Sequence, residues 1–360
     1  MPFGGWRPAS RHYKLPALHE AIIGGERMAK KMAKKTAKKK NKSVGVIGLG
    51  SMGLGVGRTL LNKGFQVHAY DVRPEVVKAF AKQGGIAAAN PAEVGANASI
   101  VILLVVNAEQ TEEVLFGRNG AAPRMARGSV VVASATVPPA YAEYLGQRLS
   151  QHGIHLVDAP VSGGAARAAS GQLSIMSSGT KNAFRQAQPV LDAIAVKVYR
   201  LGEQPGMGSK VKMINQLLAG VHIASACEAM ALGIRAGVDP NVLYEVISNS
   251  AGASWMFQNR VPHILAGDYT PLSAVNIFVK DLGIVLDSAK KLTFPLPITA
   301  TAHQMYLMAG AAGYGLEDDS AVVKVFQHLS GIPLPAKRVR ARPSATRRRA
   351  PPVKIKAKKK

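Results

Sequence analysis

Three polar residues on one predicted helix could move a proton. Lys212, Asn215 and Gln216 are spaced i, i+3 and i+4 in a long, mostly apolar stretch at 207–236, so they share one helix face. A lysine in a desolvating pocket loses part of its preference for the charged form and can serve as an acid or base. The alternative is a lysine that snorkels from an interdomain helix. Lys210 precedes Lys212 by two positions, about 200° around the helix, and is expected to face elsewhere.

A glycine pattern near the start of the predicted core is typical of dinucleotide binding. Residues 48–53 read GLGSMG, after a short apolar run at 44–47 and at the start of a helix-like stretch at 51–62. The three glycines make a tight turn, let the backbone approach a pyrophosphate and allow close helix–strand packing. The free N–H groups of the helix favour phosphates. The alternative is a glycine-rich turn in another α/β fold. We expect cofactor contacts from Gly48, Leu49, Gly50, Ser51, Met52 and Gly53.

An acidic residue follows at the spacing that this motif requires. The strand predicted at 66–70 ends at Asp71, which lies 23 residues after Gly48. A carboxylate there accepts hydrogen bonds from the ribose hydroxyls of the adenosine half and repels a 2′-phosphate. Arg73, two residues later, could counter that repulsion. On balance the carboxylate of Asp71 favours NAD over NADP.

Further elements alternate as in a doubly wound α/β sheet. A helix is predicted at 75–83, a buried strand at 99–106 and another strand at 129–133. Val106 and Asn107 lie at the end of the first strand and Thr136 follows the second, where such sheets bind ligands. We expect all three to approach the cofactor. A helix cap or a turn is the alternative role for Asn107 and Thr136.

A second glycine loop could bind an anion. Residues 156–164 read LVDAPVSGG, an apolar run followed by Ser162, Gly163 and Gly164. Such a loop presents backbone N–H groups and a hydroxyl. Any glycine-rich turn has this composition, so the loop alone predicts little.

Charge separates the chain into a core and two basic ends. The net charge is +25, but residues 1–43 and 336–360 hold 24 of the 46 Lys and Arg and only two acids. Such runs repel themselves and are expected to be disordered, with weak nucleic-acid contact as one possible role. The predicted organisation is a basic extension at 1–43, a dinucleotide-binding domain at 44–205, an all-helical domain at 206–333 and a basic tail at 334–360.

Several classes of protein and site are excluded by composition. A single cysteine, Cys227, excludes a disulfide scaffold and a cysteine-based metal site, and it fits a reducing, cytoplasmic compartment. No pair among the nine histidines has metal-ligand spacing, and no metal is expected. A transmembrane helix is not expected, because no run of 18 apolar residues is uninterrupted. Ser162 has no G-x-S-x-G setting, so a hydrolase is not indicated.

Four motifs together resemble the β-hydroxyacid dehydrogenase family. They are VGVIGLGSMG, DAPVSGG, GMGSKVKMINQ and FVKDLGI, in this order, and the resemblance covers about residues 44–333. It implies a Rossmann-type domain followed by an all-α domain, as in 6-phosphogluconate dehydrogenase, with the active site between them. It also implies NAD as cofactor, a small hydroxy acid as substrate and a homodimer or homotetramer. Segments such as SWMFQNR and GYGLEDDSAV are most similar to the branch that oxidises L-threonate.

The resemblance also assigns roles to single residues. The family's G-x-G-x-x-x-K pattern places the general acid/base at Lys212, and its substrate-carboxylate loop matches Ser162, Gly163 and Gly164. The late Lys-Asp pair near the cofactor matches Lys280 and Asp281. Four residues after the lysine the family commonly has Asn, where this chain has Gln216. Either Asn215 or Gln216 is therefore expected to orient the substrate or the lysine.

Other activities remain alternatives at this point. Within the family they are oxidation of 3-hydroxyisobutyrate and reduction of tartronate semialdehyde. In another class, the chain would be a nucleic-acid-binding protein that uses a dehydrogenase-like core for oligomerisation.

Overall fold

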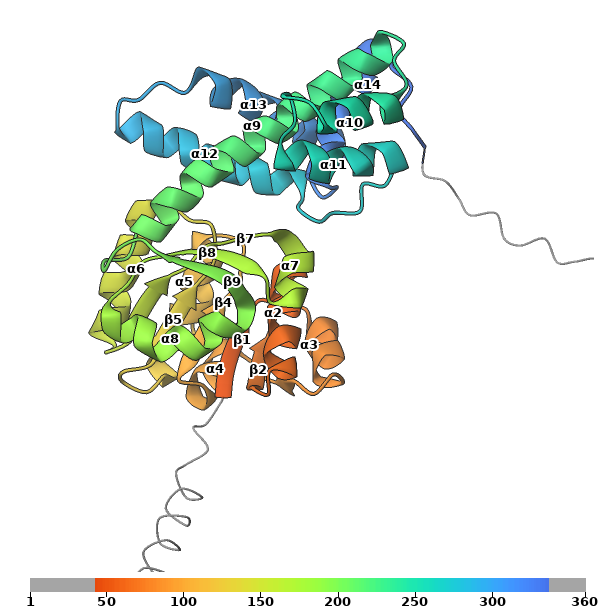
Figure 1. Cartoon of the computed structure of the whole chain (residues 1–360). Helices are drawn as coiled ribbons and strands as arrows, with labels where there is room; N and C mark the ends of the chain where they lie inside the picture. The colour runs from red at the N-terminus through yellow and green to blue at the C-terminus, as the bar shows by residue number, and fades with distance from the viewer. Residues whose placement is uncertain (1–42, 337–360) are drawn as a thin grey trace, which may run out of the picture.

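A computed structural model describes residues 43–336, so the basic ends predicted at 1–43 and 334–360 lie almost entirely outside the described residues. Its first sheet has six parallel strands in the order β3-β2-β1-β4-β5-β6 (Figure 1). This is the Rossmann order, and it confirms the predicted doubly wound sheet. The strands are β1 (Ser43–Ile47), β2 (Gln66–Tyr70), β3 (Ile86–Ala87), β4 (Ile100–Leu103), β5 (Val130–Ala133) and β6 (His155–Asp158).

Helices cover both faces of this sheet, which explains its continuous apolar strands. Val44 and Val46 of β1 pack with the helices of one face, whereas Ile47 packs into the cluster on the other. The first face holds α2 (Ser51–Asn62), α3 (Pro74–Ala81) and α8 (Lys181–Ile194). The second holds α4 (Pro91–Asn97), α5 (Ala108–Phe116), α6 (Pro139–Gln151) and the short helix η1 (Ala122–Arg124).

A smaller sheet, which the sequence did not indicate, follows the first. Its three strands are β7 (Val161–Ser162), β8 (Leu173–Ser177) and β9 (Ala195–Arg200), with α7 (Gly164–Ser170) between β7 and β8. The β7 and β8 strands are antiparallel, and β8 and β9 are parallel. An isolated bridge between Asp158 and Ser178 joins the end of β6 to the end of β8. The loop predicted to bind an anion is therefore held by a sheet edge.

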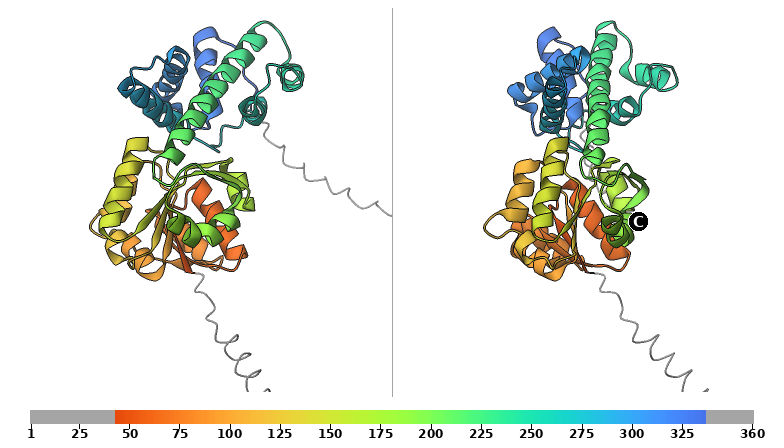
Figure 2. Two further views of the ribbon diagram at one scale, coloured as in Figure 1. Left: turned by 60° about the vertical axis from the view of Figure 1, so that its left-hand side comes forward. Right: turned by 90° about the vertical axis from the view of Figure 1, so that its left-hand side faces the viewer.

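The rest of the described chain is helical, as predicted. Helix α9 (Met207–Arg235) runs from the sheet domain into the helical domain, where the remaining helices gather around it (Figures 1 and 2). Its residues Ile223, Cys227 and Met230 lie in a second buried core. The other elements are α10 (Pro240–Ser248), α11 (Trp255–Ala266), α12 (Val275–Lys291), α13 (Pro297–Ala309), η2 (Gly310–Tyr314), η3 (Asp319–Val322) and α14 (Val323–Ser330).

Helix α9 is long and apolar enough to cross a membrane by length and composition alone. The core helix of a water-soluble protein passes the same test. In this structure 39% of its most apolar window is buried, where other helices pack on α9 in the second core.

One strand boundary differs from the sequence prediction. The apolar run at 99–106 predicts one strand, but β4 ends at Leu103. Leu104 still donates its N–H to Ile47 O, at 2.8 Å, after which the chain leaves the sheet. Val106 is 46% exposed, so apolar character continues beyond the buried strand. Beyond β4 the chain passes close to the glycine turn, because a Cβ on Gly48 would lie only 2.8 Å from the carbonyl of Leu104.

Candidate active site

The glycine motif lies at the point where the strand order reverses, between β1 and β4. Gly48 has φ +93°, a left-handed conformation that favours glycine. A Cβ on Gly53 would lie 1.8 Å from Gly48 O, so the helix packs against the turn only because residue 53 has no side chain. The open edge at a topological switch point is where α/β sheets bind ligands. The predicted motif and its place in the fold agree.

The first turn of α2 has free donors for an anion. Its N-cap residue Gly50 provides no side-chain hydrogen bond, and no acid lies in the first turn. The first N–H groups of a helix lack partners within the helix, and they lie at its positive end. A Cβ on Gly50 would meet no atom within 4 Å, so the space beside these donors is open. The residues present therefore fit a dinucleotide pyrophosphate.

Asp71 lies beside this turn and is 8% exposed. Its carboxylate accepts hydrogen bonds from Leu49 N, at 2.7 Å, and from Arg73 Nε, at 2.9 Å. Burial opposes ionisation, but the hydrogen bonds from Arg73 and Leu49 hold the pKa of Asp71 below its ordinary value. The carboxylate is thus charged at neutral pH and close to the glycine turn. Arg73 is engaged by that same carboxylate, which limits its freedom to attract a 2′-phosphate.

The residues after β4 and β5 have structural roles of their own. Asn107 caps α5, its side chain accepting from Gln110 N at 2.9 Å, while Gln110 accepts from Val106 N at 2.9 Å. These two hydrogen bonds hold the cap and the residue before it against the first turn of α5. Thr136 accepts a hydrogen bond from Lys280 Nζ on α12 through its backbone carbonyl, at 3.0 Å. Both residues lie at the carboxyl edge of the sheet, as predicted.

The helix α9 face predicted from spacing forms a buried hydrogen-bonded chain. Lys212 Nζ donates to Gln216 Oε1 at 2.7 Å, and Gln216 Nε2 donates to Asp281 Oδ2 at 2.6 Å. Asp281 also accepts from Lys280 Nζ at 2.5 Å, and Asn215 Nδ2 donates to Gln216 Oε1 at 3.0 Å. The structure therefore joins the late Lys-Asp pair of α12 to the candidate acid/base, a link that the sequence did not reveal.

Lys212 has the electrostatics of an acid/base group. It is 7% exposed, and burial lowers its pKa to about 8. Asp281 acts to raise that pKa and Lys280 to lower it. Lys210 differs, as its spacing predicts, because its ammonium pairs with Glu143 at 3.0 Å on the exposed surface. Among the two lysines at the start of α9, only Lys212 is placed in a desolvated setting.

Asp158, for which the sequence suggested no role, fixes the start of α9. Its carboxylate is 2% exposed and accepts from Gly206 N and Ser209 N, each at 2.9 Å, and from Ser209 Oγ at 2.7 Å. Ser178 Oγ also donates to it at 3.2 Å. Burial raises the pKa of Asp158, while these hydrogen bonds act against the rise. The only signal in the sequence was an acid in the DAPVSGG motif.

The glycines before Lys212 also have a packing reason. Gly206 has φ +105°, and a Cβ on Gly208 would lie 2.6 Å from Met176 O and 2.8 Å from Asp158 O. The first turn of α9 thus lies directly on β6 and β8. The spacing from Gly208 to Lys212 then places the lysine one turn above these strands.

The SGG loop begins four residues after Asp158. Ser162 ends β7, while Gly163 and Gly164 have φ +130° and +74° at the start of α7. The Ser162 side chain makes no hydrogen bond within residues 43–336, so its hydroxyl is available to a ligand. The loop and α9 share one anchor, because Asp158 holds the helix and leads into the loop.

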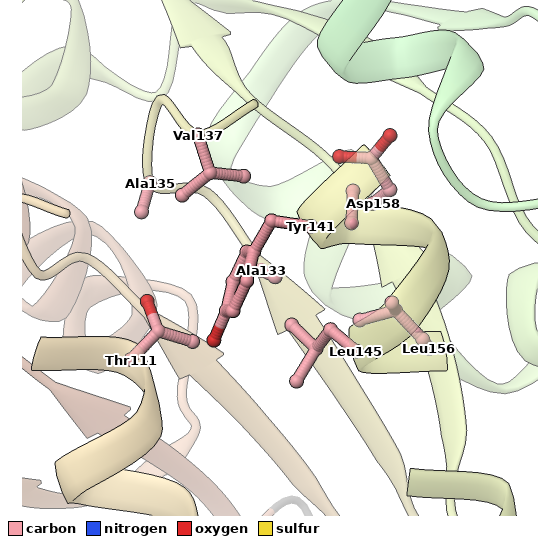
Figure 3. A pocket seen from close by; sticks show the side chains of 9 residues that line it. Thr111, Ala133, Ala135, Val137, Tyr141, Leu145, Leu156 and Asp158 are labelled. Atoms are coloured by element: carbon pink, nitrogen blue, oxygen red, sulfur yellow. The ribbon is translucent and has the colours of Figure 1, made fainter. Parts of the chain in front are cut away.

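A small apolar cavity lies beneath this anchor (Figure 3). In Figure 3 the Asp158 carboxylate points away from Tyr141 and Leu145. Tyr141, which lines it, donates its hydroxyl to Glu112 Oε1 at 2.9 Å. The cavity is a packing feature of β5, β6 and α6 and leaves Asp158 free to serve α9. Its lining residues are Thr111, Ala133, Ala135, Val137, Tyr141, Ala142, Leu145, Leu156 and Asp158.

No group of three His, Cys, Asp or Glu residues suited to a metal ion occurs within residues 43–336. The site built from these residues has a place for phosphates, a carboxylate for a ribose and a buried lysine. Such a set binds a dinucleotide and moves a proton, which is the equipment of a dehydrogenase.

Family comparisons agree with this chemistry. Residues 43–202 match the model described as NAD binding domain of 6-phosphogluconate dehydrogenase. Residues 206–326 match NAD-binding of NADP-dependent 3-hydroxyisobutyrate dehydrogenase. The two matches meet just before α9.

Individual relatives cover nearly the whole described chain. An L-threonate dehydrogenase of Cupriavidus necator is 64% identical over 82% of this chain and 99% of its own. An L-threonate dehydrogenase of Haemophilus influenzae is 50% identical over 83% and 98%. A crystal structure named 3-hydroxyisobutyrate dehydrogenase, from Salmonella typhimurium, has a TM-score of 0.76 at 49% identity and covers 79% of this chain and 99% of its own.

Proposed function

The chain belongs to the family of NAD-dependent hydroxyacid dehydrogenases that includes 3-hydroxyisobutyrate dehydrogenase, and we propose that its substrate is L-threonate. The observation that carries the reaction is Lys212, a buried lysine with a lowered pKa at the junction of the two domains. The substrate rests on the L-threonate dehydrogenase of C. necator, at 64% identity over 99% of its length. The product would be the 2-oxo acid, 2-dehydro-L-erythronate.

The residues around the switch point are proposed to hold NAD. The uncapped first turn of α2 would bind the pyrophosphate, and Asp71 the adenosine ribose. The proposed set is Gly48, Leu49, Gly50, Ser51, Met52, Gly53, Asp71, Val106, Asn107, Thr136, Lys280 and Asp281. When bound, NAD supplies the acceptor for the hydride that leaves C2 of the hydroxy acid.

Proton transfer is assigned to Lys212. In its neutral form, Lys212 Nζ accepts the proton of the C2 hydroxyl as the C–O bond becomes a carbonyl. In the reverse reaction, the ammonium returns that proton to the carbonyl oxygen. Ser162, Gly163 and Gly164 would hold the substrate carboxylate through the hydroxyl and backbone N–H groups. Asn215 and Gln216 would orient the substrate and the lysine.

Initial rates with a panel of acids test the proposed substrate. With NAD, L-threonate is expected to give NADH at a rate well above those for D-threonate, 3-hydroxyisobutyrate and D-glycerate. The same assay with NADP should be slower by at least about tenfold, because Asp71 repels the 2′-phosphate and its pairing with Arg73 restrains the guanidinium. If the enzyme prefers another acid, L-threonate is rejected as the substrate, whereas the proposed role of Lys212 in proton transfer still stands.

Two glycine variants separate folding from cofactor binding. Gly53→Ala is expected to lower the melting temperature, because its Cβ would lie 1.8 Å from Gly48 O, and overpacking of this kind costs about 1–3 kcal/mol. Gly50→Ala should leave the melting temperature unchanged, since its Cβ meets nothing within 4 Å. It should nevertheless weaken NAD binding by about tenfold, about 1.4 kcal/mol, by blocking the approach of the pyrophosphate. Thermal unfolding and NAD titration check both, and unchanged NAD affinity in Gly50→Ala would contradict the proposed site.

The proposed setting of the enzyme is the cytoplasm, as a homo-oligomer. One face of α9 presents Val211, Ile214 and Leu218, which are 38–52% exposed and spaced as an apolar seam. A second copy of this chain would cover them, and sedimentation velocity would show a species larger than a monomer.

The Lys- and Arg-rich ends, at 1–43 and 336–360, are proposed to add weak, salt-sensitive contact with nucleic acid.

A further inference from the structure

We propose that Gln216 is a positioning residue that holds Lys212 in place while keeping its ammonium apart from the carboxylate of Asp281. The inference rests on the proposed function, because it concerns the base of that reaction. It also distinguishes the roles of Gln216 and Asn215, which spacing alone leaves open.

The side chains of Lys212, Gln216 and Asp281 form a chain of two hydrogen bonds, in which each donates to the next. Gln216 Oε1 accepts from Lys212 Nζ at 2.7 Å, and the Nε2 of the same amide donates to Asp281 Oδ2 at 2.6 Å. Gln216 is 8% exposed and Asp281 only 1%, so little water screens either contact. The amide thus lies between a cation and an anion, and each end has the partner that suits it.

The orientation of the amide is fixed by more than one donor. Asn215 Nδ2 also donates to Gln216 Oε1, at 3.0 Å. A flipped amide would point its NH₂ group at two donors and its oxygen at a carboxylate. The Asn215 Oδ1 atom makes no hydrogen bond within residues 43–336. Of the two amides, Asn215 therefore keeps a free group for the substrate, and Gln216 is committed to its neighbours.

The separation matters because of what a direct pair would do. A carboxylate in contact with a buried lysine favours the charged form and so removes the base. Lys280 shares this role, since its Nζ donates to Asp281 Oδ1 at 2.5 Å and offsets that negative charge. With both arrangements in place, burial is the largest influence on Lys212 and lowers its pKa to about 8.

The other charged groups near the start of α9 are already engaged. Glu143 on α6 pairs with Lys210, and Asp158 at the end of β6 accepts from the first turn of α9. From α12, the groups that act on Lys212 are Lys280 and Asp281. The charge that most favours the ammonium form of Lys212 is therefore that of Asp281, and the Gln216 amide lies between the two groups.

A charge exchange tests the proposal without changing net charge or side-chain size. The double variant Gln216→Glu, Asp281→Asn moves the carboxylate from the far side of the bridge to direct contact with Lys212. The pH profile of kcat/KM for oxidation is expected to shift its acid limb upward by at least about one unit. The rate at pH 7 should fall about tenfold or more and recover substantially at high pH. Asp281→Asn alone should shift the same limb slightly downward.

A control variant tests whether any added carboxylate on α9 shifts the profile, and an NMR titration tests the role of Gln216 without turnover of a substrate. Ser225→Asp places a carboxylate on an exposed site of α9, about 13 Å along the helix from Gln216, and should leave the profile unchanged. NMR of ¹³C-labelled lysine follows the titration of Lys212 directly, its signal identified by its loss in Lys212→Met. A shifted NMR titration without turnover of L-threonate would support the positioning role and reject the substrate. A double variant that titrates like the parent protein would overturn the proposal.

Discussion

Lys212→Met is expected to lower kcat for oxidation by about 10²- to 10⁴-fold, the range attributed to a positioned acid/base. The methionine keeps the length and the burial of the side chain but cannot carry a proton. Because Lys212 is 7% exposed, the apolar replacement should not destabilise the fold. The Kd of NAD, measured by fluorescence titration, should stay within about threefold, since α2 and Asp71 are untouched.

Lys210→Met is the matched control for this result. It removes a lysine two residues away, with half of its side chain exposed and its ammonium paired to Glu143. Exposed ion pairs contribute little to stability, so both kcat and the melting temperature should change only slightly. Equal losses of kcat in the two variants would show that removing any lysine from the start of α9 impairs the enzyme, and that Lys212 has no specific role. Wild-type turnover in Lys212→Met would exclude the lysine as the base.

The lowered pKa of Lys212 determines whether the rate of each reaction rises or falls with pH. Oxidation needs the neutral amine, so kcat/KM for the hydroxy acid should rise with pH and level off above about 8. Reduction of the 2-oxo acid needs the ammonium and should fall over the same range. At pH 7 about one Lys212 in ten is then neutral, against roughly one in 2,500 for an ordinary lysine. A stopped-time assay from pH 6 to 10 in both directions checks the opposite slopes.

The sequence predicted the parts of the site that depend on neighbours along the chain. The GLGSMG turn, the strand before it and the helix after it lie within 20 residues, and Asp71 ends the next strand, so spacing alone placed them. Spacing also put Lys212, Asn215 and Gln216 on one helix face, but only the family's G-x-G-x-x-x-K pattern assigned the acid/base role to Lys212. Local periodicity also predicted an all-helical domain after residue 206.

Contacts between distant segments were beyond that reasoning. Asp281 lies 65 residues after Gln216, and only the packing of α12 on α9 brings them within 2.6 Å. The β7–β9 sheet was missed because β7 has only two residues and β9 mixes apolar residues with Lys and Arg and is largely exposed. Asn107 was expected at the cofactor edge, and its place there also makes it the cap of α5. Sequence spacing identifies residues that share an element, whereas the pairing of elements needs the fold.

Asp158→Ala is expected to destabilise the sheet domain strongly. The carboxylate accepts three hydrogen bonds from the start of α9 and one from Ser178, and its removal leaves buried donors without partners. Loss of charged hydrogen bonds at a buried site suggests a fall of about 2–4 kcal/mol in the free energy of unfolding. Denaturant unfolding measures that fall directly.

Activity should fall further than stability alone requires. Asp158 fixes the first turn of α9 one turn below Lys212 and leads into the SGG loop, so its loss moves the base relative to the substrate. Displacements of about 1 Å in a reacting geometry cost on the order of 10²-fold in rate. We therefore expect kcat to drop by about that factor at a temperature where the variant is folded.

Asp239→Ala provides the comparison, because Asp239 also caps a helix with its carboxylate. It accepts from Asn241 N and Val242 N at the start of α10, but on the exposed surface of the helical domain. The two variants remove the same chemical group from the same kind of position, and they differ in burial and in which helix is held. If both lowered stability equally and neither changed kcat, Asp158 would be an ordinary cap. A large loss confined to Asp158→Ala would show that the buried carboxylate aligns the catalytic helix with the sheet.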